Sequence, residues 1–143
     1  RAIAEMNDGS LHMVSRFVKA SGGCSAPAGK DAAAALARLG KMQIRMRNPT
    51  LGEQIQTQVI VSHPNYTGLQ FDQKARKYIP SHYVNNIVIS YNDKQLISLD
   101  AGISVSEDPS IRFIFTPIVA GEIKVDAADT KEKTFTFQKS IGS

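Results

Sequence analysis

Apolar and polar positions alternate over most of the chain from Lys41 to its end. Met42, Ile44 and Met46 alternate with polar residues. A period of two places successive side chains on opposite faces of a strand, with one face toward a core. Comparable segments follow at 55–61, 84–91, 94–99, 111–116, 122–127 and 134–138. Short strands separated by turn residues predict an all-β fold, an antiparallel immunoglobulin-like β-sandwich of about seven strands. The pattern leaves the strand order open.

Two connections within this region differ sharply in character. Asn92-Asp93 separates two strand patterns and predicts the clearest hairpin of the chain. The polar segment from Asn65 to Ser81 carries Lys74, Arg76 and Lys77, and we expect a long loop or an irregular hairpin there.

The first 18 residues predict a separate β-hairpin. Asn7-Asp8-Gly9-Ser10 is a strong turn signal between a short apolar segment and the strand pattern of Leu11 to Val18. Leu11, Met13 and Phe17 lie on one face of this strand, and Val14 and Val18 lie on the other. We therefore expect the strand to be covered on both sides, by another chain or by the sandwich, since an isolated hairpin is marginal in water.

A short helix is predicted immediately before the sandwich. Asp31 can cap an alanine-rich segment that ends with Leu39, and Gly40 is a suitable stop. So short a helix needs docking to be stable, and we interpret it as a linker.

The segment from Lys19 to Lys30 holds the single cysteine, Cys24, behind Gly22 and Gly23. Adjacent glycines give the backbone wide conformational freedom, and no bulky side chain lies between the two lysines. Nearby cations favour the reactive thiolate. A lone cysteine is otherwise a small buried residue, but no large apolar neighbour surrounds this one. The composition favours an exposed, reactive thiol on a narrow arm.

Length and charge set limits on the class of protein. The 143 residues suit one domain with an appendage, and the formal net charge is +4. Residues 1–47 hold eight basic and three acidic residues, and the remainder is nearly balanced. Such a basic segment favours anionic small molecules or an acidic protein face. No basic run is interleaved with aromatic residues, and no apolar run could span a bilayer, so we expect neither nucleic acid nor membrane as a partner.

The other candidate chemistries are weaker. His12, His63 and His82 show no ligand spacing with each other or with Cys24, so we predict no metal and no bound cofactor. Asp129 and the other carboxylates fall mostly in predicted turns, where they bond the local backbone. A distant histidine could converge on Cys24 as in a Cys–His hydrolase, although a double-glycine arm is a poor place for a rigid nucleophile.

These motifs resemble a known family. Gly22-Gly23-Cys24, after the Asn-Asp-Gly turn and a strand ending in Val18-Lys19, resembles the end of SoxY, the sulfur carrier of bacterial thiosulfate oxidation. The chain from Lys41 resembles SoxZ, the β-sandwich partner of SoxY. The matching features are Ile79-Pro80, the Asn92-Asp93 hairpin, the segment 103–109 and Gly121-Glu122-Ile123. The whole is similar to fused SoxYZ-like carriers associated with quinoprotein dehydrogenases.

The resemblance implies a division at 1–27, 28–40 and 41–143, namely the SoxY-like hairpin with its cysteine arm, the linker helix and the SoxZ-like sandwich. It further implies a periplasmic, non-enzymatic carrier that holds a sulfur intermediate on Cys24, with Gly22 and Gly23 as the hinge. Partners would be periplasmic redox enzymes, either Sox-type cytochromes or a quinoprotein dehydrogenase. The remaining SoxY-like domain or a second copy of the chain would also associate.

Two features depart from the family pattern. SoxY typically ends just after its cysteine, whereas here Ser25-Ala26-Pro27 follow and the arm is tethered at both ends. Only the last hairpin of a SoxY-like domain is present. A non-covalent adaptor for a periplasmic dehydrogenase is therefore an alternative function, and a thiol-dependent enzyme is a third.

Overall fold

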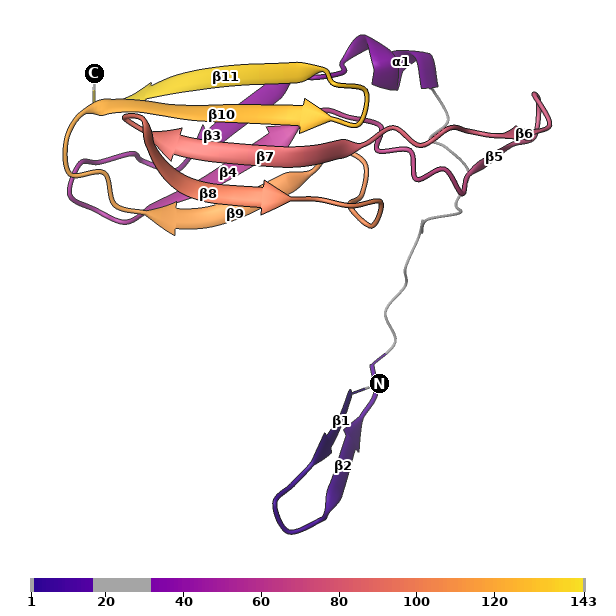
Figure 1. Ribbon diagram of the computed structural model, residues 1–143. Helices are drawn as coiled ribbons and strands as arrows, with labels where there is room; N and C mark the ends of the chain where they lie inside the picture. Colours follow the sequence, from indigo (N-terminus) through magenta and orange to yellow (C-terminus); the bar gives the residue numbers. More distant parts are fainter. Residues whose placement is uncertain (1, 17–31, 143) are drawn as a thin grey trace.

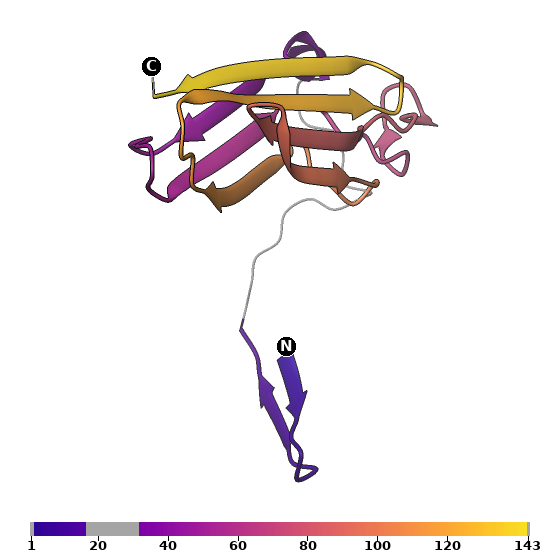
Figure 2. The ribbon, with the colours of Figure 1, turned by 60° about the vertical axis from the view of Figure 1, so that its left-hand side comes forward.

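The structure, a computed structural model, describes residues 2–16 and 32–142. In the second range, two antiparallel sheets face each other (Figures 1 and 2). One sheet has the order β11-β10-β7-β8 and the other β3-β4-β9. These seven strands confirm the predicted sandwich. Their bounds are β3 Met42–Met46, β4 Ile55–Val61, β7 Val84–Tyr91, β8 Lys94–Asp100, β9 Ser110–Phe115, β10 Gly121–Asp129 and β11 Thr134–Ile141.

The core lies between the sheets and follows from the alternating sequence. On β4, Ile55, Val59 and Val61 are buried, and the glutamines between them face outward. The facing sheet contributes Ile87 and Ile89 from β7 and Ile123 and Val125 from β10. Burying an aliphatic side chain of this size stabilises a fold by about 1.5–3 kcal/mol. The two central strands of the larger sheet therefore supply much of the core.

The β7–β8 hairpin turns where the sequence predicts it. Asn92 and Asp93 both have positive φ, 47° and 61°, as a tight hairpin turn requires. The Asn92 side chain also accepts a hydrogen bond from the Glu122 amide at 2.9 Å. It lies so close to Gly121 that a Cβ there would collide with it, which explains the glycine at the start of β10.

A short helix, α1, spans Ala32–Ala37 and precedes the sandwich. Gly40 ends this segment with a φ of +76°, and the ring of Phe135 occupies the space that a side chain at that position would need. The expected helix and its glycine stop are both present, although the helix ends two residues before Leu39.

The predicted irregular hairpin within 65–81 consists of two very short strands, β5 (Phe71–Asp72) and β6 (Lys77–Tyr78). Leu69, Phe71 and Tyr78 are exposed along it. No described helix is long and apolar enough to cross a membrane.

The N-terminal hairpin consists of β1 (Ala2–Glu5) and β2 (Leu11–Val14). Its turn is closed by Asp8, whose carboxylate accepts the Ser10 amide at 2.9 Å, and by Gly9 with a φ of +81°. The strand ends at Val14, and Phe17 and Val18 of the predicted strand lie outside the described residues. The expected cover on both sides is absent from the described residues, since Leu11, Met13 and Val14 are each more than 60% exposed.

Candidate functional site

Cys24, Gly22 and Gly23 lie outside the described residues, so the structure leaves the predicted carrier site untested. The structure does describe the segment 32–41 that follows the arm, which we call the anchor. Helix α1 begins at Ala32, eight residues after Cys24.

The anchor is held to the sandwich by main-chain and charged contacts. The Gly40 amide donates to the Ser62 carbonyl, and the Ser62 amide donates to the Lys41 carbonyl, each at 2.8 Å. Arg38 forms ion pairs with Glu107, at 2.7 Å, and with Asp108. The hydrogen bond to Asp108 raises the pKa of Arg38. The segment after the arm is therefore fixed to one end of the sandwich.

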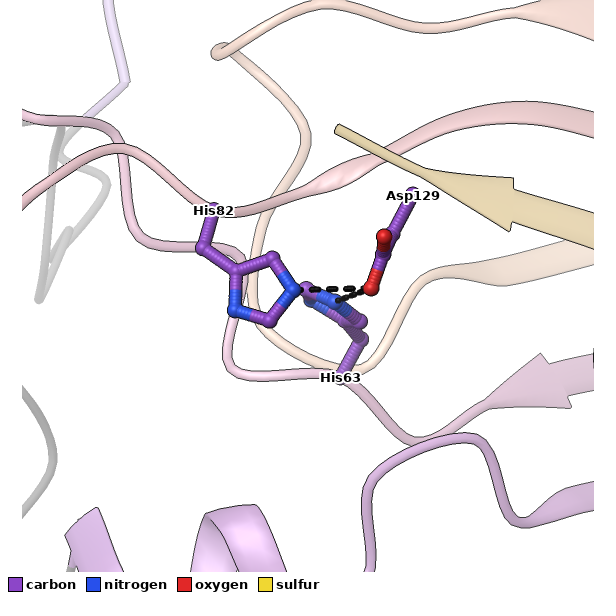
Figure 3. A group of neighbouring side chains, drawn as sticks. All are labelled: His63, His82 and Asp129. Carbon is purple, nitrogen blue, oxygen red and sulfur yellow. Dashed lines mark hydrogen bonds and ion pairs between the residues drawn. The ribbon is translucent and has the colours of Figure 1, made fainter. Parts of the chain in front are cut away.

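A buried polar cluster lies beside this anchor. Asp108 accepts a hydrogen bond from the His63 amide at 3.0 Å and donates its own amide to the His63 carbonyl. The side chains of His63, His82 and Asp129 converge on one another, as Figure 3 shows. His63 follows β4, His82 precedes β7, and Asp129 ends β10, so three strand ends meet here.

Both histidines are directed at one oxygen of Asp129. His82 Nε2 lies 2.7 Å from Asp129 Oδ2, and His63 Nε2 lies 3.5 Å from the same atom. The two rings meet edge to face with centroids 4.6 Å apart. The side chains of His63 and Asp129 are fully buried. This arrangement corrects the interpretation that the histidines are unrelated.

The other oxygen of Asp129 serves the β10–β11 turn, as expected for an aspartate in that position. Oδ1 accepts the amides of Lys131 at 2.8 Å and of Lys133 at 3.0 Å. Burial acts to raise the pKa of Asp129, but the hydrogen bonds from His82, Lys133 and Lys131 outweigh it and lower the pKa. Asp129 therefore stays a carboxylate that joins the turn to His82 and lies close to His63.

The cluster offers two imidazole nitrogens and one carboxylate oxygen within 4.8 Å of one another, a donor set that zinc accepts. A ligating histidine carries its proton on the nitrogen that does not bind the metal. His63 Nδ1, however, accepts the Asn65 amide hydrogen at 3.0 Å, so the proton of the neutral ring sits on Nε2. This tautomer does not fit metal binding at Nε2. The residues fit a hydrogen-bonded cluster around a buried carboxylate.

His63 resists protonation in this site. Burial, followed by the neighbouring His82, lowers the pKa of His63, against the opposing effect of Asp129. Within the described part of the chain, His63 Nε2 has no partner at hydrogen-bonding geometry. A neutral His63 is the form that this end of the sandwich accommodates.

Comparison with known proteins identifies the sandwich. The family model described as "Sulphur oxidation protein SoxZ" matches residues 44–140, which is more than half of the chain. The chain belongs to the SoxZ family. The match begins within β3 and ends within β11, and it does not include α1 or the N-terminal hairpin. The resemblance of the opening segment to SoxY stays a prediction.

Solved structures resemble the SoxZ sandwich in fold alone. A superoxide reductase (neelaredoxin) from Ignicoccus hospitalis aligns with a TM-score of 0.53 and 13% identity over 78% of this chain and 86% of its own. A Thermotoga maritima protein, provisionally assigned as a superoxide reductase, aligns with a TM-score of 0.51 and 16% identity over 70% of this chain and 83% of its own. A search of curated proteins matched none.

Proposed function

We propose that this SoxZ-family protein is a periplasmic carrier that holds a sulfur intermediate covalently on Cys24. The intermediate is a thiosulfonate or persulfide, Gly22 and Gly23 form the hinge of the arm, and the chain has no catalytic site of its own. Family membership supports a role in sulfur oxidation and a partnership with other Sox proteins such as SoxY.

One observation carries the proposal: the only thiol of the chain lies eight residues before a helix that is fixed to a SoxZ sandwich. Eight residues extend at most about 28 Å. The thiol is thus tethered close to the anchored end of the sandwich, which would dock to the enzyme that receives the intermediate. Sox-type cytochromes or a quinoprotein dehydrogenase are the proposed recipients.

The test is the mass of the intact protein isolated from its native host, measured with and without reductant. We expect added mass on Cys24 that the reductant removes. Cys24→Ser should carry no adduct and should keep its melting temperature, because a thiol on an arm contributes no packing to the core. The matched control combines Cys24→Ser with Ser98→Cys, which moves the thiol to an exposed position of a sheet. This variant should gain no such adduct.

Two results would contradict the carrier. A wild-type chain whose mass is unchanged by reductant, although it still binds its partner enzyme, would favour the non-covalent adaptor. A large loss of melting temperature in Cys24→Ser would show a core cysteine.

A further inference from the structure

The outer face of the sheet β3-β4-β9 carries a groove of about 570 Å³ that has no assigned role. Its walls follow from the strand register. Arg45 pairs with Gln58, and Gln58 pairs with Arg112, so these three side chains form one row across the strands. Gln56 pairs with Ile114, and Arg47 lies at the β3 end of that second row.

A third row of residues lies between these two walls. Met46, Thr57 and Phe113 form the row between the two walls, and they line the groove as well. Their side chains belong to the inward-facing set of each strand, so they meet the groove through their backbone. Backbone amides at these three positions are therefore natural reporters of anything bound there.

The groove is strongly cationic. Three arginines line it, and none of its lining residues is acidic. Among the described residues, neither Arg47 nor Arg112 forms an ion pair, and Arg45 donates only to Gln43 Oε1, at 2.8 Å. Unpaired arginines on two sides of one groove give an electrostatic field that concentrates anions.

We propose that this groove binds a sulfate-type oxyanion, either free or as the S-sulfo group of an organic molecule. Guanidinium donors match the oxygens of tetrahedral oxyanions in a bidentate geometry. Oxidation of sulfur generates such anions, so the family role supplies the ligand class. The volume falls within the range of small-molecule sites, and the exposed side chain of Ile114 offers apolar contact to an organic group.

This inference rests on the sulfur-oxidation role of the family but not on the loading of Cys24. The experiment is therefore done with the Cys24→Ser chain, which can carry no covalent intermediate. Binding in the groove and failure of the carrier proposal are then independent results.

The measurement is nuclear magnetic resonance of the ¹⁵N-labelled Cys24→Ser chain, titrated with sodium sulfate, sodium thiosulfate or S-sulfocysteine at an ionic strength held constant with sodium chloride. We expect saturable shifts at the amides of Met46, Thr57 and Phe113 and at the arginine side chains of the groove. Saturation by the inorganic salts indicates a free oxyanion. Tighter binding of S-sulfocysteine indicates an organic S-sulfo group.

Arg45→Gln and Arg112→Gln should each weaken the binding about tenfold, as loss of a charge-assisted hydrogen bond does. Both positions are exposed, so the spectra should otherwise stay those of the folded chain. Lys94→Gln removes the same charge from the other sheet and should leave the affinity unchanged. The proposal is overturned if no probe gives saturable shifts, or if Lys94→Gln weakens binding as much as the arginine variants.

Discussion

His63 is the residue of the buried cluster whose protonation the fold opposes, and this has a consequence for stability. Its pKa is lowered below the ordinary value of 6.5, chiefly by burial. Below about pH 6.5 this histidine is protonated in the unfolded chain but remains neutral in the folded chain. The contribution of neutral His63 to the free energy of unfolding is therefore fully present above pH 6.5. It is lost as the pH drops below this value, by at most about 1.4 kcal/mol per pH unit.

His63→Asn tests this dependence, because an asparagine oxygen can replace Nδ1 as the acceptor of the Asn65 amide while removing the titrating ring. Denaturant unfolding at several pH values gives the free energy of unfolding of both proteins. Between pH 6.5 and 5 this free energy should fall less steeply with pH in the variant. His12→Asn, in the exposed hairpin, is the matched control and should keep the wild-type dependence of unfolding free energy on pH. Equal slopes in all three proteins would refute the role of His63.

The sequence predicts only part of this cluster. Asp129 was expected in a turn, and its Oδ1 does bond the turn amides. Its other oxygen faces two histidines, and this depends on the strand order. The strands β7 and β10 are distant in sequence, but they pair so that Asp129 lies opposite Val84. Local spacing contains no such information. A predicted β7–β10 pairing would have brought His82 close to Asp129, and His63 would still have required the packing of one sheet on the other.

At the scale of elements, the N-terminal hairpin is the feature that most needs a partner. Ile3, Leu11, Met13 and Val14 are exposed on both of its faces. Two paired strands with uncovered apolar faces are marginal and prone to edge pairing. We predict that the full chain associates, either with a separate SoxY-like polypeptide or with a second copy. Sedimentation at micromolar concentration, with denaturing gels to detect another polypeptide, measures this.

Met13→Lys with Val14→Lys places charge on both faces of the hairpin and should shift the chain toward monomer, because a buried charge without a partner is costly. Leu96→Lys with Leu99→Lys, on β8 of the sandwich, is the matched control and should not change the hairpin-dependent association. A wild-type chain that stays monomeric, with rapid amide exchange throughout Leu11–Val14, would contradict the prediction.

Elements were predictable where one local signal decided them. Asn92-Asp93 defined the β7–β8 hairpin because only a few residue types accept positive φ at both turn positions. Gly40 defined the end of the linker for the same reason. The strands β5 and β6, of two residues each, are too short to produce a period. The end of β2 was misplaced because the apolar pattern continues beyond the last paired residue, Val14.

At the scale of the whole molecule, the thirteen residues of the buried core cluster all lie between Met42 and Ile141. They come from both sheets, and the family match covers nearly the same range. Among the described side chains of helix α1, Ala35 is the only buried apolar one, and the ion pairs of Arg38 are partly exposed. Exposed ion pairs contribute little to folding. The sandwich thus holds its core without the preceding segments.

A fragment that begins at Lys41 should therefore fold cooperatively by itself. It keeps the Ser62-to-Lys41 hydrogen bond and loses the contacts of α1, the ion pairs of Arg38 and the hydrogen bond from Gly40 to Ser62. Because these contacts lie outside the core, we expect one thermal transition within about 5 °C of that of the full chain. A second fragment that begins at Ala32 retains α1 and should melt at the temperature of the full chain. This result would assign the difference in melting temperature to the anchor rather than to the arm. Calorimetry and circular dichroism measure both fragments. A fragment from Lys41 that melts without cooperativity, while the one from Ala32 melts sharply, would make the anchor part of the folding unit. The arm would then join the folding unit directly at α1, and motion of the cysteine would be coupled to the stability of the sandwich.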